Sequence, residues 1–373
     1  MTKKKAIFLT NKESLYSDIT GGVQLCSQEF HGLIGKIEEL EVADYYVKFT
    51  RRILDRIIIR LGFENYNMYD IRKDTTSLLK YIEDSKIEVV FINMASLVGY
   101  AEVIKQKFGE NVKIVLLSHG NHSGDFLHLI SKPIDNPNRL KFFIRKVRLG
   151  MLVSKESLFR VKYLDSVITL SETEKQIENW FGSKKSIFVP RQLAQKFINY
   201  KPTKGRIGFV GRLDHPPNLQ GIQILLEALK TCGSEEVEFR LVGAPFNYGA
   251  SIKENYPFIS YLGELSDKEL EDEVSTWTIF INPVWWYSTG ASTKLAKAIS
   301  WGIPIITTTA GMRGYFWKEG ELITADTPEE MAKLLINVSH DLDQVTICEQ
   351  NTKRVAQSGL TISELTDLIR SSY

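Results

Sequence analysis

Cysteine and long apolar runs are both scarce in this chain. Its three cysteines, Cys26, Cys232 and Cys348, lie far apart and lack the C-x-x-C spacing of metal and redox sites. This pattern excludes a disulfide framework and favours a reducing compartment. No segment approaches the run of about 18 apolar residues that a membrane-spanning helix requires. The run AIFL near the N-terminus is too short for a signal peptide, so we expect a cytoplasmic protein.

Net charge is low as well, at +2 over 373 residues, but it is unevenly distributed. Residues 1–190 contain 29 Lys and Arg against 23 Asp and Glu, which leaves 18 and 22 for residues 191–373. A basic half and a faintly acidic half predict two domains with different partners. The length and the hydrophobic fraction of 43% are those of a globular protein with two or three domains.

Short buried strands alternate with amphipathic helices along the chain, and the alternation restarts near residue 206. This pattern predicts an α/β fold with two Rossmann-like parallel-sheet domains that face a central cleft. The expected strands are 4–10, 86–93, 113–118, 165–171, 185–190, 206–211, 238–243, 258–263, 278–284 and 303–308. The expected domains are residues 1–190, a linker at 191–205, residues 206–354, and a C-terminal helix at 355–373 that packs back on the first domain.

Arg212 follows a strand in the second half, at the edge where ligands bind to parallel sheets. It comes directly after Gly211, and a helix is expected to begin near Asn218. Free N–H groups at a helix start favour an anion, and an Arg can offer two parallel hydrogen bonds to a phosphate. The alternative is a surface Arg beside an ordinary turn.

Lys294 is the second candidate cation, in the stretch STGASTKLAKAISWGIPI. The small residues Gly290, Ser292 and Thr293 allow the backbone to approach a ligand at a helix start. A Lys in the first helical turn opposes the helix dipole, and a phosphate contact would explain its presence. The alternative is that Lys294 extends into solvent.

Glycines mark two further strand ends. Gly311 and Gly314 follow the strand at 303–308, where backbone N–H groups can line a phosphate nest. Gly21 and Gly22 precede the first long helix, where they would let a ligand approach the backbone or would form a plain turn. Each pair is a weak signal when taken alone.

Basic residues of the first half gather in two amphipathic helical segments, 45–63 and 138–165. Such helices suit the surface of an anionic membrane, which attracts each basic residue by about 1 kcal/mol. We therefore expect a protein peripheral to the inner face of the cell membrane. The alternatives are solvated helix faces or contact with a polyanionic glycan, and no nucleic-acid motif accompanies the charges. The residues expected at this surface are Arg51, Arg52, Arg56, Arg145, Lys146 and Arg148.

One segment, HGNHSGDFLH, gathers potential metal ligands in His119, His122, Asp125 and His128. Their spacing matches no closed structural zinc site, so no metal is expected. The Asp-Leu-Asp at 341–343 resembles a metal motif but lies in a helical stretch, where a solvated face is expected.

Taken in order, these elements resemble the GT-B glycosyltransferases. In particular they are similar to the large retaining bacterial family, glycosyl transferases group 1, that builds capsules, O-antigens and exopolysaccharides. The segments that carry the resemblance are GG at 21–22, LLSHG at 116–120, VITLSETEKQIENWFG at 167–182, IFVP at 187–190, FVGRLDHPPNLQGI at 209–222 and KLAKAISWGIPIITTTAGMRGY at 294–315. They extend over nearly the whole chain and are more specific in the second half.

The resemblance implies a nucleotide-sugar donor held mainly by the C-terminal domain and an acceptor held by the N-terminal domain. Arg212 and Lys294 would bind the diphosphate and stabilise the charge that develops on the leaving phosphate. Gly21 and Gly22 would lie beside the donor phosphates or the acceptor, and His119 would face the transferred sugar. The implied reaction is metal-independent transfer, with retention, to a glycan or lipid-linked acceptor in surface polysaccharide synthesis.

Two departures from the family pattern leave alternatives open. The family's two glutamates are replaced by Thr289 and Lys297, and a charged Lys has no acceptor for the hydroxyls of a ribose. The usual Asn-Gly after IFVP is replaced by Arg191 and Gln192. The alternative is a catalytically inactive GT-B scaffold, or a membrane-associated partner that binds a nucleotide or a glycan.

The stereochemistry decides which residues the reaction needs. Retention requires no protein nucleophile, whereas inversion requires a base near the acceptor, for which His119 and Asp125 are the candidates. An epimerase of the same architecture is less well supported, because the sequence shows no convincing carboxylate–histidine set.

Overall fold

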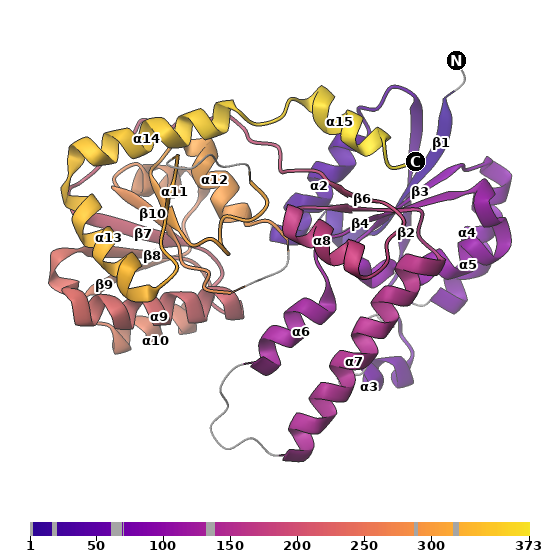
Figure 1. The fold of residues 1–373 in the computed structure, drawn as a ribbon, viewed down its shortest axis with the longest axis horizontal. Coiled ribbons are helices and arrows are strands. Elements are labelled where there is room, and N and C mark those ends of the chain that lie inside the picture. Colours follow the sequence, from indigo (N-terminus) through magenta and orange to yellow (C-terminus); the bar gives the residue numbers. More distant parts are fainter. Residues whose placement is uncertain are drawn as a thin grey trace. The chain divides into compact units, whose positions relative to one another are not determined.

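The computed structural model describes residues 3–16, 21–60, 69, 71–131, 139–286, 290–315 and 321–373 (Figure 1). The chain forms two compact units. The first unit comprises residues 1–192, 289–291 and 360–373, and the second comprises residues 193–288 and 292–359. The chain therefore passes between the units four times, after residues 192, 288, 291 and 359.

The first unit is built on a parallel six-stranded sheet of order β2-β1-β3-β4-β5-β6. Its strands are β1 (Lys4–Asn11), β2 (Leu40–Val47), β3 (Val89–Asn93), β4 (Lys113–Leu117), β5 (Ser166–Thr169) and β6 (Ser186–Phe188). Its helices are α1 (Lys12–Leu15), α2 (Gly22–Ile34), α3 (Ile53–Arg60), α4 (Ile71–Ser85), α5 (Gly99–Phe108), α6 (His122–Ser131), α7 (Arg139–Lys162), α8 (Glu172–Trp180) and α15 (Ile362–Arg370). Every residue of β3 is buried, as a parallel strand with helices on both faces requires.

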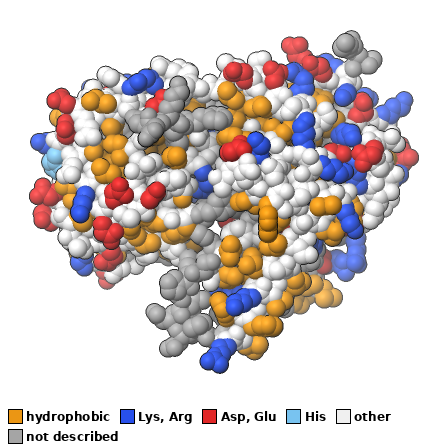
Figure 2. Space-filling view, viewed as in Figure 1, with side chains coloured by type: hydrophobic (Ala, Val, Ile, Leu, Met, Phe, Trp, Pro, Cys, Tyr) orange, Lys and Arg blue, Asp and Glu red, His pale blue; other side chains and the backbone are white. Residues whose placement is uncertain are grey.

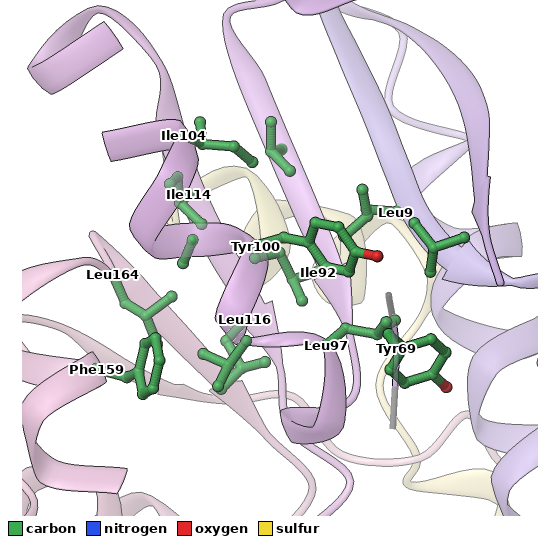
Figure 3. Packing of buried hydrophobic residues seen from close by; sticks show 14 of the residues in the cluster. Leu9, Tyr69, Ile92, Leu97, Tyr100, Ile104, Ile114, Leu116, Phe159 and Leu164 are labelled. Atoms are coloured by element: carbon green, nitrogen blue, oxygen red, sulfur yellow. The ribbon is translucent and has the colours of Figure 1, made fainter. Parts of the chain in front are cut away.

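The core of the first unit lies between this sheet and the helices that follow its strands. Figure 3 shows how Leu9 of β1, Ile92 of β3 and Leu116 of β4 lie close to Tyr100 of α5 and Phe159 of α7. All five side chains are buried, so the sheet is fixed from β1 to β4 and its strand ends are held in place.

The second unit has a sheet of the same kind, with the strand order β12-β11-β10-β7-β8-β9 and parallel pairing throughout. Its strands are β7 (Arg206–Val210), β8 (Glu238–Val242), β9 (Ile259–Gly263), β10 (Ile279–Asn282), β11 (Ile305–Thr307) and β12 (Ile323–Thr324). Its helices are α9 (Pro216–Cys232), α10 (Phe246–Asn255), α11 (Asp267–Val274), α12 (Thr293–Trp301), α13 (Pro328–His340) and α14 (Leu342–Gln357).

Each sheet contains one switch point, where neighbouring strands lead the chain in opposite directions across the sheet. In the first sheet it lies between β1 and β3, and in the second between β7 and β10. The carboxyl ends of the strands at a switch point form the position where open α/β sheets bind ligands. Arg212 lies just after β7 at the switch point of the second sheet, whereas His119 follows β4, the neighbour of β3 in the first sheet.

The predicted fold class is confirmed, and each of the ten expected strands coincides with an observed one. Strands β2 and β12 were not predicted. The expected helix over 45–63 is wrong at its start, because residues 45–47 end β2 and α3 begins at Ile53. Strand β2 lies at the sheet edge and is only partly buried, so its sequence LEVADYYV lacks a clear apolar run. Residues 61–63 lie outside the described part.

Helix α15 belongs to the first unit, although it is formed by the last residues of the chain. It packs against α2 and β6. The Ser166 hydroxyl of β5 donates to the Ser372 carbonyl at 2.8 Å, and the Tyr373 ring meets Phe91 of β3 edge-on at 5.7 Å between centroids. The C-terminal residues therefore complete the core of the N-terminal sheet.

Candidate active site

Lys294, in the first turn of α12, is the centre of the candidate site in the second unit. Its Nζ donates to Asn218 Oδ1 at 2.8 Å and lies 5.7 Å from the centroid of the Phe209 ring. Burial lowers the pKa of Lys294 to about 8, and the charge of Arg313 acts in the same direction. Among the described residues no carboxylate forms an ion pair with this lysine, so its surroundings favour an anionic ligand.

Gly211 and Asn218 explain how the fold accommodates this lysine. A Cβ on Gly211 would lie 2.9 Å from Lys294 Cδ and 3.0 Å from Phe209 Cζ, so glycine leaves room for the lysine stem. Asn218 accepts from Lys294 and also donates to the Arg212 carbonyl at 2.7 Å. It therefore links the two candidate cations. From the sequence we predicted only a helix start at Asn218, because its partner Lys294 is 76 residues away.

Arg212 follows β7, as predicted, but its guanidinium is already paired. Its Nε and Nη2 donate to the two carboxylate oxygens of Asp214 at 2.9 and 2.6 Å. This pairing lowers the pKa of the Asp214 carboxyl. The Arg212 side chain is 56% exposed, and an exposed pair of this kind contributes little to stability. The guanidinium is therefore held only weakly by Asp214.

Arg313 is a third cation near this site and was not predicted from the sequence. It lies in the loop after β11 and donates from Nη1 to the Ala310 carbonyl at 2.6 Å. Its positive charge lowers the pKa of Lys294, as a like charge nearby does, although burial has the larger effect. A bound diphosphate would offset both positive charges. Lys294, Arg212, Arg313 and Asn218 are called the phosphate cluster below.

The candidate glycines have a structural role, and some of their amides are occupied. The Gly311 N–H donates to Thr308 Oγ1 at 2.8 Å. Gly314 has a φ of +89°, in the region that favours glycine. Gly290 has a φ of +69°, and its N–H donates to Glu174 Oε1 in the first unit at 2.7 Å. These residues shape the loops at the strand ends.

Ser292 and Thr293 form the start of α12. The Ser292 hydroxyl accepts a hydrogen bond from the Leu295 N–H at 3.3 Å, which is the geometry of a helix cap. The Ser292 carbonyl accepts from the Tyr315 hydroxyl. Thr293 is the first residue of the helix and is half-buried. The cap thus fixes the helical turn that carries Lys294.

Lys297, which stands at a family glutamate position, does not join the phosphate cluster. Its Nζ forms an exposed ion pair with Asp267 of α11 at 3.0 Å and lies over the Trp301 ring. Thr289, at the other glutamate position, lies outside the described residues. The charge of Lys297 is therefore already paired with a carboxylate outside the surroundings of Lys294.

In the first unit, His119 follows β4 and is held by Asn93 at the end of β3. The His119 Nε2 lies 2.9 Å from Asn93 Oδ1, and the ring packs against Phe30 with centroids 5.9 Å apart. Burial and the charge of Arg191 lower the pKa of His119 to about 3, so the ring is neutral at physiological pH. The sequence singled out His119, but the role of Asn93 was not predicted.

Arg191 and Gln192, which replace the family's Asn-Gly, are tied to α2 within the first unit. Arg191 Nε and the Gln192 N–H both donate to the carboxylate of Glu29. Arg191 Nη1 also lies 2.9 Å from Cys26 Sγ, and burial raises the pKa of the Cys26 thiol to about 11. These contacts fix the point at which the chain leaves the first unit.

Gly21 and Gly22 lie at the start of α2, where Gly21 is the capping residue and its N–H donates to Gln24 Oε1 at 3.2 Å.

The segment with several histidines, residues 119–128, was considered as a source of metal ligands. His122 in this segment is part-buried, and its burial together with the charges of Arg160 and Arg148 lowers its pKa to about 4. Asp125 is exposed in the first turn of α6, and the side chain of His128 lies outside the description. The described residues contain no group of three or more potential ligands that could hold a metal ion.

Helices α3 and α7 carry the basic residues expected at a membrane. Arg51 and Arg52 precede α3, Arg56 lies in it, and α7 contains Arg145, Lys146 and Arg148. Both helices also expose large apolar side chains, as Figure 2 shows for hydrophobic and basic groups over the lower part of α7. The exposed apolar residues are Ile53, Leu54 and Ile57 on α3 and Leu140, Phe143, Ile144, Val147, Met151, Leu158 and Val161 on α7. Of the helices described, none is long and apolar enough to cross a bilayer.

Comparison with known proteins gives a family and a fold. Residues 204–341 match the family described as Glycosyl transferases group 1. The Anabaena protein Alr3699/HepE, in complex with UDP, is 15% identical with a TM-score of 0.63 over 99% of both chains. A glycosyltransferase from Rickettsia africae ESF-5 is 12% identical with a TM-score of 0.64, covering 100% of this chain and 98% of that one. The lipopolysaccharide outer core galactosyltransferase WaaB is 13% identical with a TM-score of 0.61, covering 99% and 100%.

At these identities the structural likeness establishes the GT-B architecture of the whole chain. No curated protein matches the sequence. Apart from residues 289–291, the family match lies within the second unit, which contains the phosphate cluster. Residues 204–341 thus match the group 1 glycosyltransferase family and the whole chain has the GT-B fold, in agreement with the resemblance seen in the sequence.

Proposed function

We propose that the chain transfers a sugar, with retention, from a nucleoside-diphosphate sugar to a glycan or lipid-linked acceptor in bacterial surface polysaccharide synthesis. The observation that carries this proposal is Lys294, whose pKa is about 8 and whose charge is not balanced by a carboxylate among the described residues. A diphosphate supplies the missing negative charge. The Anabaena relative has been solved with UDP and with UDP-glucose, so UDP is the first nucleotide to test.

The charges that develop during the reaction indicate the role of each residue. When the bond between the anomeric carbon and the diphosphate breaks, positive charge develops on the sugar and negative charge on the phosphate. Lys294, Arg212 and Arg313 stabilise the departing diphosphate. The acceptor oxygen bonds to the anomeric carbon on the face that the diphosphate leaves, and the acceptor proton passes to the released phosphate. His119 is a poor base for this proton, because its pKa is about 3.

Nucleotide binding is the first test of this function. In a thermal-shift screen of UDP, GDP, TDP, CDP and CMP, we expect one nucleotide to raise the melting temperature of the wild-type chain. Lys294→Ala and Arg212→Ala should abolish or strongly reduce that shift, because each removes a cation of the phosphate cluster. Lys297→Ala is the matched control and should keep it, because the Lys297 charge is paired with Asp267 of α11.

A wild-type chain that responds to none of these nucleotides would favour the second candidate function, a non-catalytic scaffold. The exposed Lys297 at a family glutamate position is the observation that favours the scaffold. If the nucleotide binds equally well to both phosphate-cluster variants, the donor lies elsewhere and the assignment of Lys294 is wrong.

We further propose that the exposed face of α3 and α7 rests on the inner surface of the cell membrane. The face combines Ile53 (76% exposed) and Phe143 (63% exposed) with basic residues at its rim. Apolar side chains suit the acyl boundary, and the basic ones suit anionic headgroups. A lipid-linked acceptor would be reached from such a position. We also propose that the sugar transfer needs no metal ion and that the protein is located in the cytoplasm.

Vesicle binding tests the membrane contact. Replacing Arg145 and Lys146 with Gln should weaken binding to phosphatidylglycerol-containing vesicles about 30-fold, because each basic residue contributes about 1 kcal/mol. Phe143→Glu should also weaken binding, whereas Phe246→Glu, on the equally exposed Phe246 of the second unit, should not. Flotation at two salt concentrations is the measurement. Binding of the wild type to neutral phosphatidylcholine vesicles alone, without salt dependence, would contradict the proposal.

A further inference from the structure

A cavity of about 270 Å³ lies in the first unit, where the start of α3 meets α4, α5 and α7. The described residues that line it all belong to this unit, and none of them is part of the phosphate cluster. Pockets for drug-sized ligands measure about 300–1,000 Å³, so this one suits a smaller molecule. The chemistry of its walls indicates which class of molecule it would hold.

Three cations from separate elements line the cavity. Arg52 precedes α3, Arg72 lies in the first turn of α4, and Lys155 lies in α7. Arg72 is exposed and forms no ion pair with a described carboxylate. Arg52 Nε lies 4.0 Å from Asp55 Oδ2, which is beyond hydrogen-bonding distance. Both guanidinium groups can therefore offer parallel hydrogen bonds to a phosphate.

Two carboxylates, Asp55 and Glu102, line the same cavity. Asp55 Oδ2 accepts from the Thr50 hydroxyl at 2.8 Å, and Glu102 Oε1 accepts from the Tyr163 hydroxyl at 3.0 Å. The other oxygen of each carboxylate accepts no hydrogen bond from the residues that the structure describes. An ionised carboxylate repels a phosphate and accepts from a hydroxyl. The mixed lining therefore favours a ligand that has both a phosphate and hydroxyl groups.

The cavity also has an apolar wall and adjoins the exposed face of α7. Tyr69 and Phe159 both line it, and both are buried in the core of the first unit. Met151 and Leu158 are exposed, and they lie four residues before and three residues after Lys155. This spacing places them on the same face of the helix as Lys155. The cavity is therefore next to apolar side chains that we place at the membrane.

We propose that this cavity binds a polyol phosphate, which is a phosphate ester with free hydroxyl groups, of the size of glycerol phosphate. Arg52, Arg72 and Lys155 bind the phosphate, and the hydroxyls donate to Asp55 and Glu102. Two sources share this chemistry, the headgroup of phosphatidylglycerol and a free phosphate ester. The exposed apolar side chains beside Lys155 favour the lipid. The lipid source rests on the proposed membrane contact, whereas binding of the free ester does not.

Isothermal titration of the full chain with glycerol 3-phosphate tests the free ester. Arg72→Gln should weaken binding about tenfold or more, because it removes a charge-assisted contact to the phosphate. Lys73→Gln is the control, since it removes the same charge from the next residue of α4, which is exposed and does not line the cavity. Both positions are exposed, so both variants should fold. Equal losses in the two variants would indicate general attraction and overturn the proposal.

Flotation with two kinds of vesicle tests the lipid source. Phosphatidylglycerol and phosphatidylserine at the same mole fraction give vesicles of equal charge, so general attraction to them is alike. We expect tighter binding to phosphatidylglycerol. Arg72→Gln should remove this preference and Lys73→Gln should keep it, even where both weaken binding overall.

The two measurements together separate the sources. A preference for phosphatidylglycerol without binding of glycerol 3-phosphate supports the lipid, and the reverse result supports the free ester. A wild-type chain that shows neither overturns the proposal. The thermal shift with UDP reports on the phosphate cluster alone, so a chain that binds glycerol 3-phosphate but no nucleotide would contradict the proposed sugar transfer and support the cavity.

Discussion

Lys294→Met should lower kcat/KM about 10²- to 10³-fold, which is the usual loss when one preorganised stabiliser of a leaving group is removed. Methionine keeps an unbranched stem in the space that Gly211 leaves, so the packing against Phe209 survives while the charge is lost. Steady-state kinetics and the Kd of UDP are the measurements. Unchanged kinetics in a folded Lys294→Met chain would remove the main support for the donor site.

The same substitution should stabilise the free chain slightly. Burial lowers the pKa of Lys294 to about 8, so the folded state disfavours the charged form at neutral pH. Removing the charge removes this penalty, and the melting temperature without nucleotide should rise or stay constant. Opposite effects on activity and stability are characteristic of the substitution of a functional residue. Substitution of a structural lysine would lower both the activity and the stability.

The pH dependence of UDP binding follows from the same pKa. Below about pH 8 the free Lys294 is charged, and above it the free lysine is neutral. A bound diphosphate favours the charged form and raises this pKa, so binding takes up a proton at higher pH. The Kd of UDP should therefore rise as the pH increases above about 8, and Lys294→Met should lack this rise. Isothermal titration at several pH values measures both.

Gly221→Ala should destabilise the chain by about 3 kcal/mol or more, because it overpacks a contact between two backbone segments. A Cβ on Gly221 of α9 would lie 1.9 Å from the carbonyl oxygen of Pro283, just after β10. Because both contacting groups belong to the backbone, neither can rotate away as a flexible side chain would. We expect the melting temperature to fall by about 5–10 °C. The hydrogen bond of 3.1 Å from the Trp285 indole N–H to the Gly221 carbonyl should be disturbed as well.

Two other glycines provide the matched control for this substitution. Gly32 in α2 and Gly150 in α7 lie within helices, and a Cβ at either would meet nothing within 4 Å. Alanine favours a helix over glycine by about 1 kcal/mol, so both variants should be neutral or slightly stabilised. If Gly221→Ala behaves like these controls in calorimetry, the packing of α9 on Pro283 is looser than the structure indicates.

The sequence predicted the strands and the principal cations because their signals are local. Buried strands such as β7 show apolar runs, and Arg212 and Lys294 stand at fixed offsets from strand and helix ends. The edge strand β2 was missed because its partly exposed residues interrupt the apolar pattern. Asn93 and Asn218 were missed as site residues for a different reason. Their roles depend on partners 26 and 76 residues away, which only the folded chain brings within hydrogen-bonding distance.

The place of α15 in the first unit sets an order on folding during synthesis. The ribosome releases residues 1–192 long before residues 360–373 of the same unit. Until then the surfaces of α2 and β6 lack the helix that buries Leu365 and Ile369 against them. The second unit is complete in sequence at residue 359, so the N-terminal unit is the later one to close. A nascent chain therefore completes its first unit only after residues 360–373 have been made.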